Sequence, residues 1–435
     1  MDFDFFRELL SFDSTSGKEW EVAEWLIRRL PDLFPPSNRP DLRAEEVGDD
    51  TINLLLTWGE PKLVFCSHLD TVPPYIAPTF PKGVEHDSHQ DSFAPLGMTV
   101  TCHSEEVEDR RKNLTPGETS SVIPNEVPPV IPGLTSPVIP GLTGNLPDII
   151  AGRGTCDAKG QVFAMVTACQ KLAEEGCSDF GLLLLAGEET GSWGAKAFAK
   201  TGFKADYLVV GEPTDNCMVS ASKGTKSYDL KFTGVPFHSG YPEHGVSAVD
   251  LFVDFVNRLR EQDFGIDPVL GETTWNIGLL KSDNPQNILS PELTCRLYFR
   301  TTFVSDEAVT AWMAKAPDML IDGRLEPAMT SSAVPGMTPS DVPDLTSPVI
   351  PGLTGNLTVT PRGGDTPARY WTVPDLPSKC VAFGSDAPHL KNFKHKAICG
   401  PGSINVAHRD DEHILVADLE TAVKQYLALY REVTK

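Results

Sequence analysis

The stretch Lys62–Thr71, KLVFCSHLDT, predicts a buried strand that ends in a pair of polar side chains. Short apolar runs that stop at polar residues are typical of parallel strands covered on both faces. Residues i and i+2 of an extended chain point the same way, so His68 and Asp70 are presented together. Such a carboxylate can hold one nitrogen of an imidazole whose other nitrogen binds a metal ion. A hydrogen-bonded pair on the surface explains the same two residues.

Two further apolar runs end in acidic residues. Leu182–Ala186 leads to the adjacent acids Glu188 and Glu189, and Asp206–Val210 leads to Glu212. Adjacent carboxylates after a buried strand need a cation or a proton, although a solvated loop pair also fits. The carboxyl ends of parallel strands meet at one edge of a sheet, so we expect these acids to lie together.

Segments with helical periodicity alternate with these strands. The spacing predicts helices over Val162–Glu175 and Ala195–Lys200, and a capping-box pattern from Ser16 to Glu19 opens a helix that continues to Leu30. Alternating strands and helices predict an α/β fold with a mostly parallel sheet flanked by helices.

A glycine-rich segment, GRGTCDAKG, precedes the first of these helices at Gly152–Gly160. It places Asp157 at a helix amino terminus, where an N-cap role is the ordinary explanation. The full dinucleotide pattern is absent and Asp157 would repel a pyrophosphate, so we exclude nucleotide binding. A later segment, GPGSINVAH, brings His408 back to the same core.

Together these segments supply nitrogen and oxygen metal donors. Two histidines and three carboxylates suit a pair of divalent metal ions, with one carboxylate left over as a base. No cysteine belongs to the set, which argues against a purely structural zinc site.

A different pattern begins after Glu212. The predicted strands are Tyr228–Phe232, Trp275–Leu279 and Leu293–Thr301, and the predicted helices are Val246–Gln262 and Asp306–Ala316. This order predicts a smaller α+β domain at residues 213–377, inserted into a catalytic di-metal domain made of residues 1–212 and 378–435.

Two proline-rich stretches, residues 81–147 and 327–361, interrupt the chain. Both contain the string LTSPVIPGLTGNL, at Leu134–Leu146 and at Leu345–Leu357. Closely spaced prolines deny the backbone donors that a helix or central strand needs. We interpret the stretches as inserted, disordered loops, with a docking segment for an aromatic groove as the rival interpretation.

Composition narrows the class of protein further. The 435 residues include 37 Lys and Arg against 60 Asp and Glu, a net charge of −23, which argues against a nucleic-acid partner. The acidic amino terminus and the short apolar runs predict neither a secretory signal nor a membrane span. Nine scattered cysteines favour reduced thiols, so we expect a cytoplasmic protein.

The motifs SHLDTVP, GRGTCDAKG, GEETG, GEPT, FHSG and GPG…AH follow one another in this order along the chain. In this they resemble the di-zinc deacetylases and peptidases, which include acetylornithine deacetylase, succinyl-diaminopimelate desuccinylase, aminoacylase and glutamate carboxypeptidase. The resemblance covers nearly the whole chain outside the proline-rich stretches. It implies two zinc ions, or cobalt in their place, one held by His68, Asp157 and Glu212, and the other by Asp157, Glu189 and His408.

The same resemblance implies roles for residues beside the metal ions. Asp70 would orient His68, and Glu188 would be the general base. The smaller domain would be a lid that also forms a homodimer, and His238 of the FHSG motif would reach the active site of the partner subunit. Taken alone, His238 is better explained as a loop histidine beside a glycine.

Asn287 and Arg300 match family positions that bind the carboxylate side of the substrate. Arginine suits that role because its guanidinium can bind a carboxylate through two hydrogen bonds, although a structural arginine fits equally well. The residues after Asn287 and Ile288, Leu289-Ser290, depart from the family's more usual Ile-Pro.

Within the family, GEPT and GPGSINVAH look most like acetylornithine deacetylase. This implies hydrolysis of a small N-acyl amino acid such as N-acetylornithine, with loss of an acetyl group, as in arginine biosynthesis. The alternatives are a succinyl-diaminopimelate desuccinylase or a metallo-dipeptidase or carboxypeptidase. An inactive metal-binding homologue would lack a ligand or the base, and all of these residues are present.

Overall fold

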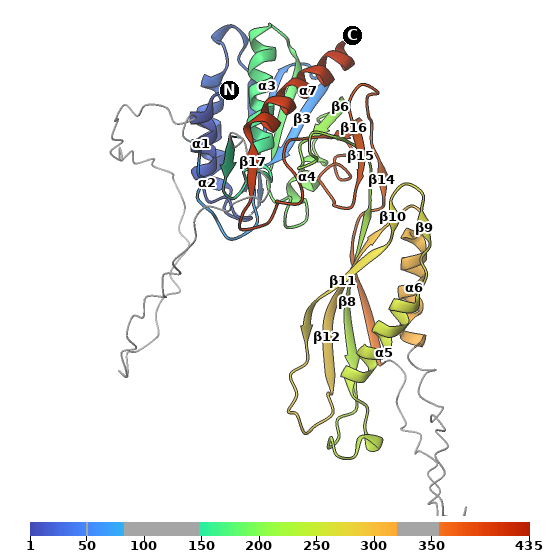
Figure 1. Ribbon diagram of the computed structural model, residues 1–435. Helices are drawn as coiled ribbons and strands as arrows, with labels where there is room; N and C mark the ends of the chain where they lie inside the picture. Colours follow the sequence, from blue (N-terminus) through green and yellow to red (C-terminus); the bar gives the residue numbers. More distant parts are fainter. Residues whose placement is uncertain (49–50, 82–147, 320–355) are drawn as a thin grey trace, which may run out of the picture. The chain divides into compact units, whose positions relative to one another are not determined.

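The computed structural model describes residues 1–48, 51–81, 148–319 and 356–435. Its largest sheet has six strands in the order β1-β2-β5-β3-β6-β16 (Figure 1). They are β1 (Asp41–Gly48), β2 (Thr51–Gly59), β3 (Leu63–His68), β5 (Asp179–Leu185), β6 (Ala205–Val210) and β16 (Phe393–Ile398). β3 is parallel to β5 and β6, and β16 is parallel to β6. The predicted α/β class with a mostly parallel sheet is therefore confirmed.

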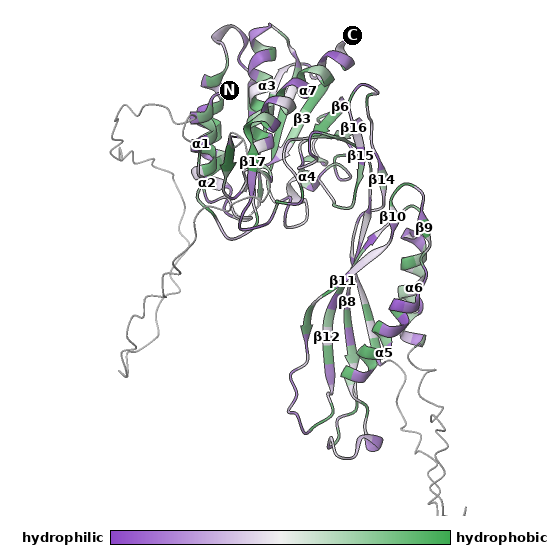
Figure 2. Cartoon of the chain, in the orientation of Figure 1, coloured by the Kyte–Doolittle hydropathy of each residue, from purple (hydrophilic) through white to green (hydrophobic). Residues whose placement is uncertain are grey.

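Helices cover both faces of this sheet. They are α1 (Phe3–Ser11), α2 (Trp20–Arg29), α3 (Lys159–Glu174), α4 (Trp193–Phe198) and α7 (Val416–Thr434). Leu182 and Leu184 of β5 belong to one hydrophobic core with α1, α2, α3 and α7, whereas Leu183 and Leu185 belong to a second core with α4. Because alternate side chains of a strand point to opposite faces, both faces of β5 are buried. Figure 2 shows β3 as hydrophobic along most of its length, in agreement with the burial of all its residues.

The predicted strands and helices of this region are confirmed, as β3, β5, β6, α3 and α4, with ends that differ by a few residues. The antiparallel pair β1–β2 beside β5 was not predicted. β1 is largely exposed and rich in charged residues, so it carries no alternating hydrophobic pattern.

The predicted capping box at Ser16–Glu19 is wrong. Helix α2 begins at Trp20 without a side-chain cap. The Ser16 hydroxyl donates instead to the Asp70 carboxylate at 2.8 Å, and Glu19 accepts from the backbone N–H groups of Gly17 and Gly187. The Ser16 hydroxyl thus bonds to the buried Asp70 carboxylate, which follows β3, and does not cap α2.

A second sheet has four antiparallel strands in the order β11-β12-β8-β13. They are β8 (Gly224–Thr233), β11 (Thr274–Lys281), β12 (Glu292–Thr301) and β13 (Leu357–Gly363), and they pack with α5 (Ala248–Glu261) and α6 (Asp306–Met319). The predicted strands and helices of the smaller α+β region are confirmed by these elements.

The hydrophobic core of the second sheet extends from Tyr228 to Leu357. Met218 and Val219 pack instead in the two cores of the six-stranded sheet. They lie in a three-stranded sheet of β7 (Met218–Ser222), β14 (Ala368–Arg369) and β15 (Ser378–Val381). Residues of the range 213–377, predicted as the smaller domain, are therefore divided between the cores of the two sheets.

Most of the two proline-rich stretches lies outside the described residues. The prediction that these stretches are disordered therefore also falls outside the described residues. The end of the second stretch, Leu357–Pro361, belongs to β13 and pairs with β8. The limit at residue 361 therefore includes part of a strand.

The remaining elements are short. They are β4 (Ile149–Ala151), which pairs with β17 (His413–Leu415), β9 (Ile266–Asp267), which pairs with β10 (Gly271–Glu272), and 3-10 turns at Leu30–Leu33, Pro36–Asn38 and Pro242–His244. In the described ranges, every helix is too short or too polar to cross a lipid bilayer.

Candidate metal centre

The predicted metal donors lie at the carboxyl-terminal edge of the six-stranded sheet. His68 ends β3, Glu188 and Glu189 follow β5, and Glu212 follows β6. Asp157 stands just before α3, and His408 lies in the loop after β16. Because β3, β5 and β6 are parallel, their ends meet, and the sheet brings these side chains together.

Among the described residues, three overlapping groups of potential ligands form, and in each the ligand atoms lie within 4.8 Å of one another. Two are the predicted sets, His68 with Asp157 and Glu212, and Asp157 with Glu189 and His408. The third is His68, Glu188 and Glu189, so the Glu188 carboxylate also lies near a possible metal position. The Nε2 atom of His68 is 3.1 Å from Asp157 Oδ1, and that of His408 is 3.3 Å from Asp157 Oδ2. Asp157 therefore presents one oxygen to each histidine, as a bridging carboxylate would.

The donor set fits two divalent cations. His68 places Nδ1 3.0 Å from the Asp70 carbonyl oxygen, so a neutral ring that donates there turns the lone pair of Nε2 toward a carboxylate oxygen. That contact needs a proton or a cation between the two atoms. Glu212 Oε1 is buried without a hydrogen-bond partner. Imidazole nitrogen and carboxylate oxygen are donors that zinc accepts.

Burial and ion pairing shift the pKa values of these groups in opposite directions. Burial raises the pKa of the Glu188 and Glu212 carboxyls well above their usual range, and neighbouring carboxylates add to the shift. Burial also acts to raise the pKa of Asp157, but hydrogen bonds from His408 and His68 outweigh it and lower the value. The site thus concentrates negative charge that cations can compensate.

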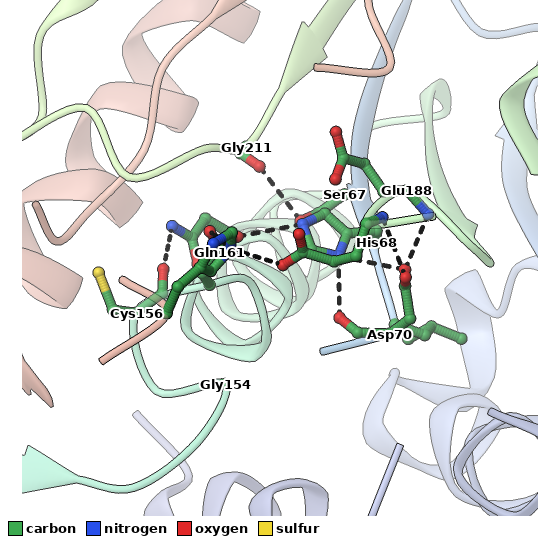
Figure 3. Close-up of polar contacts among 12 residues, drawn as sticks. Ser67, His68, Asp70, Gly154, Cys156, Gln161, Glu188 and Gly211 are labelled. Carbon is green, nitrogen blue, oxygen red and sulfur yellow. Dashed lines mark hydrogen bonds and ion pairs between the residues drawn. The ribbon is translucent and has the colours of Figure 1, made fainter. Parts of the chain in front are cut away.

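That Asp70 orients His68 stays a prediction, and the structure shows further contacts of Asp70. Its side-chain Oδ1 is 3.4 Å from His68 Nδ1, farther than its own backbone oxygen. The carboxylate accepts shorter hydrogen bonds from the backbone N–H groups of Glu188, at 3.0 Å, and Glu189, at 3.1 Å. Figure 3 shows the Glu188 carboxylate directed away from Asp70 while its backbone nitrogen faces it. Asp70 therefore ties the ends of β3 and β5 together.

A buried ion pair holds the loop that carries Asp157. Arg153 Nη1 lies 2.6 Å from Glu412 Oε2, and both side chains are about 1 % exposed. Glu412 Oε1 accepts from the backbone N–H groups of Gly154, Cys156 and Asp157. Sequence analysis missed this role, because residues 258 positions apart leave no spacing signal.

The same arginine supports the loop of His408. Arg153 Nη1 also donates to the carbonyl oxygen of Arg409 at 3.1 Å. His408 has a φ of 63°, a left-handed conformation that costs a side-chain-bearing residue about 1–2 kcal/mol. Hydrogen bonds on the next residue help to hold His408 in that conformation.

A cavity of about 460 Å³ opens beside the metal donors. Glu188, Glu189 and His408 line it together with Arg300, Tyr298 and Arg362. Arg300 thus lines this cavity, and its role in binding substrate stays a prediction. Arg362 lines the cavity too and was missed because it belongs to no recognised motif. Asp386 was missed for the same reason: it is buried, its Oδ1 has no hydrogen-bond partner, and burial raises its pKa to about 6.

His238 and Asn287 are not among the residues that line this cavity. They lie near each other in the smaller region, where the Ser239 N–H donates to the Asn287 carbonyl oxygen and His238 bridges to Ile288. His238 is exposed, and its Nδ1 accepts from the Gly240 N–H. Within one chain the structure therefore does not bring these two residues to the metal donors.

A cavity that joins metal donors to a further carboxylate defines a metal-dependent hydrolase. Comparison with known proteins agrees with this class. Residues 137–350 match the model of peptidase family M20/M25/M40. A probable carboxypeptidase of Emericella nidulans is 32% identical over 458 residues, which cover 97% of this chain and 87% of the relative. One of Aspergillus clavatus is 30% identical over 445 residues, with coverage of 98% and 87%.

Solved structures share the fold. A tripeptidase from Staphylococcus aureus superposes with a TM-score of 0.66 at 17% identity, over 99% of this chain and 97% of that one. A family M20 metallo-carboxypeptidase from Sulfolobus solfataricus gives 0.58 at 15% identity, over 98% of each chain. The chain belongs to peptidase family M20/M25/M40, and it is a metallohydrolase that acts on amide or peptide bonds. The relatives' names favour the peptidase alternative of the sequence analysis over acetylornithine deacetylase.

The Arg153–Glu412 pair generates a prediction. Glu412→Gln can still accept the loop N–H groups but leaves a buried guanidinium without its counter-charge, so we expect a loss of about 3–5 kcal/mol of stability. Urea unfolding measures the loss of stability, and elemental analysis measures the bound metal of the same variant. The exposed neighbour Asp410→Asn is the control and should change stability by less than about 0.5 kcal/mol. Equal unfolding midpoints for the two variants would contradict the assignment.

Proposed function

We propose that this protein is a metal-dependent carboxypeptidase or dipeptidase that releases a carboxyl-terminal amino acid from a short peptide. The names of the probable carboxypeptidases among the relatives favour a peptide as the substrate. The observation that carries the release of a residue with a free carboxylate is Arg300 in the cavity of the metal donors. Its guanidinium lies 5.0 Å from the centre of the Tyr298 ring, and none of the ion pairs in the described ranges includes it. A free guanidinium beside a hydrolytic centre suits the carboxylate of the residue that leaves.

The residues divide the chemistry between them. His68, Asp157 and Glu212 would hold one ion, and Asp157, Glu189 and His408 would hold the other, with zinc as the proposed metal and cobalt as the substitute. When bound, such ions would supply polarisation of the scissile carbonyl and a lower pKa for the attacking water. Glu188 lines the cavity and is the proposed general base, which takes the proton of the water and passes it to the leaving amine.

A second candidate is hydrolysis of N-acetylornithine or a related N-acyl amino acid. The segments GEPT and GPGSINVAH favour it, because they resemble the acetylornithine deacetylase branch. Both candidates fit a reducing, cytoplasmic setting, which we propose from the free thiols of all the cysteines that the structure describes.

A substrate panel tests the proposal. After chelation and addition of zinc, we expect peptides with a free carboxyl terminus to be hydrolysed, and their amidated counterparts at least about tenfold more slowly, because Arg300 loses its partner. Arg300→Met should remove most of this preference, and metal-free protein should be inactive. N-acetylornithine hydrolysed faster than every peptide would establish the deacetylase instead, and activity that survives chelation would contradict both candidates.

The role of Glu188 is tested separately. Glu188→Gln keeps the size of the side chain but cannot take a proton, so kcat should fall by about 10²–10⁴-fold while metal content stays near that of the native protein. Glu189→Gln is the matched control, because the neighbouring proposed ligand should lose metal as well as activity. Equal metal loss in both variants would make Glu188 a ligand rather than the base.

We also propose a homodimer in which His238 stabilises the transition state in the partner subunit, as the family resemblance implies. Exposed apolar residues of the smaller region support association, among them Leu279 and Leu280 on the edge strand β11 and Val253 on α5. Leu280→Asp should shift sedimentation from dimer to monomer, whereas Lys424→Asp on α7 should not. A native chain that sediments as a monomer at high concentration would refute the dimer.

A further inference from the structure

The turn after β5 is held in an unusual way, by side chains from three other elements. Four consecutive backbone N–H groups, from Ala186 to Glu189, each donate to a side-chain oxygen. Asn53 Oδ1 accepts from Ala186 at 3.1 Å, and Glu19 Oε1 accepts from Gly187 at 3.2 Å. Asp70 accepts the remaining two. The turn that carries Glu188 and Glu189 therefore takes its position from residues remote in sequence.

The carbonyl oxygens of the turn bond locally, since the Gly191 and Ser192 N–H groups donate to Glu188 and the Gly194 N–H donates to Ala186. Its N–H groups depend on the remote side chains. It leaves the sheet after Leu185, and Gly187 has a φ of 65°, a conformation that side-chain-bearing residues rarely adopt. A Cβ on Gly187 would lie 1.8 Å from Trp193 Nε1, so the backbone passes directly against the indole.

Glu19 links this turn to the amino-terminal loop. The residue is fully buried, and its second oxygen accepts from the Gly17 N–H at 2.7 Å. Ser16 in the same loop donates to Asp70. A buried carboxylate that accepts one N–H with each oxygen fixes two loops relative to each other, because hydrogen bonds to a charged acceptor are shorter and stronger than neutral ones.

We infer that Glu19 is a positioning residue for hydrolysis, which acts through the Gly187 N–H to hold the Glu188–Glu189 turn. It is not among the residues that line the cavity or among those that form the ligand groups. Asn53 supports the same turn from β2, since it accepts from Ala186 and donates to the Gly194 carbonyl oxygen at 2.9 Å. The inference rests on the proposed role of Glu188 as the base.

Hydrogen exchange with mass spectrometry tests directly whether Glu19 stabilises the turn through the Gly187 N–H. The measurement is made on the full chain with and without zinc. Glu19→Ala removes the acceptor of the Gly187 N–H, so exchange in a peptide covering 186–190 should quicken by about ten- to a hundredfold. Glu19→Gln keeps one amide oxygen and should show a smaller increase. Exposed Glu21→Gln, in the adjacent helix α2, is the control and should leave exchange in the turn unchanged.

Steady-state kinetics supplies the second readout. For a positioning role, Glu19→Gln should lower kcat by about tenfold or more while KM and metal content stay close to native values, because substrate and ligand contacts are intact. A purely structural role would instead lower the thermal midpoint without this split. Unchanged exchange in the turn of both Glu19 variants would overturn the inference. Activity retained in Glu188→Gln would refute the proposed base without altering the exchange result, so the two failures are distinguishable.

Discussion

Repulsion between carboxylates at one edge of a sheet is the constraint on which the rest of the structure depends. Asp157, Glu188, Glu189 and Glu212 lie together at the ends of buried elements, and burial disfavours their charged forms. Two kinds of partner make the arrangement stable. Imidazoles lie against the carboxylates on the cavity side, where the proposed cations would compensate the remaining charge. Hydrogen bonds from backbone N–H groups to Asp70, Glu19 and Glu412 hold the loops on the other side.

The sequence predicted that the proposed donors meet at one edge of the sheet, because each one lies beside a recognisable element. Apolar strands that stop at polar residues place their last side chains at one edge of a parallel sheet, and this rule alone locates His68, Glu189 and Glu212. The supporting residues had no such signal. Glu19 bonds to Gly187 across 168 positions of sequence, and the local pattern around it indicated a capping box instead. Local rules fail where a buried acceptor serves a distant segment.

The centre tolerates a long separation along the chain between its parts. His68 and Asp157 are 89 residues apart in sequence, yet their side chains lie 3.1 Å apart. Loop-closure entropy grows only with the logarithm of loop length, so added residues between β3 and α3 cost little stability once the sheet has formed. What must be fixed is the path of the two loop ends. The Arg153–Glu412 pair does this at the Asp157 end.

The two candidate activities share more than their names suggest. A peptide cleaved at its last bond and an N-acetyl amino acid both present an amide whose amine side carries a free carboxylate. Arg300 would bind that carboxylate in either case and so does not discriminate between them. The difference lies on the acyl side, where one substrate has a methyl group and the other a peptide. We therefore expect specificity to depend on the part of the cavity that receives the acyl side, and not on the proposed ligands or the base.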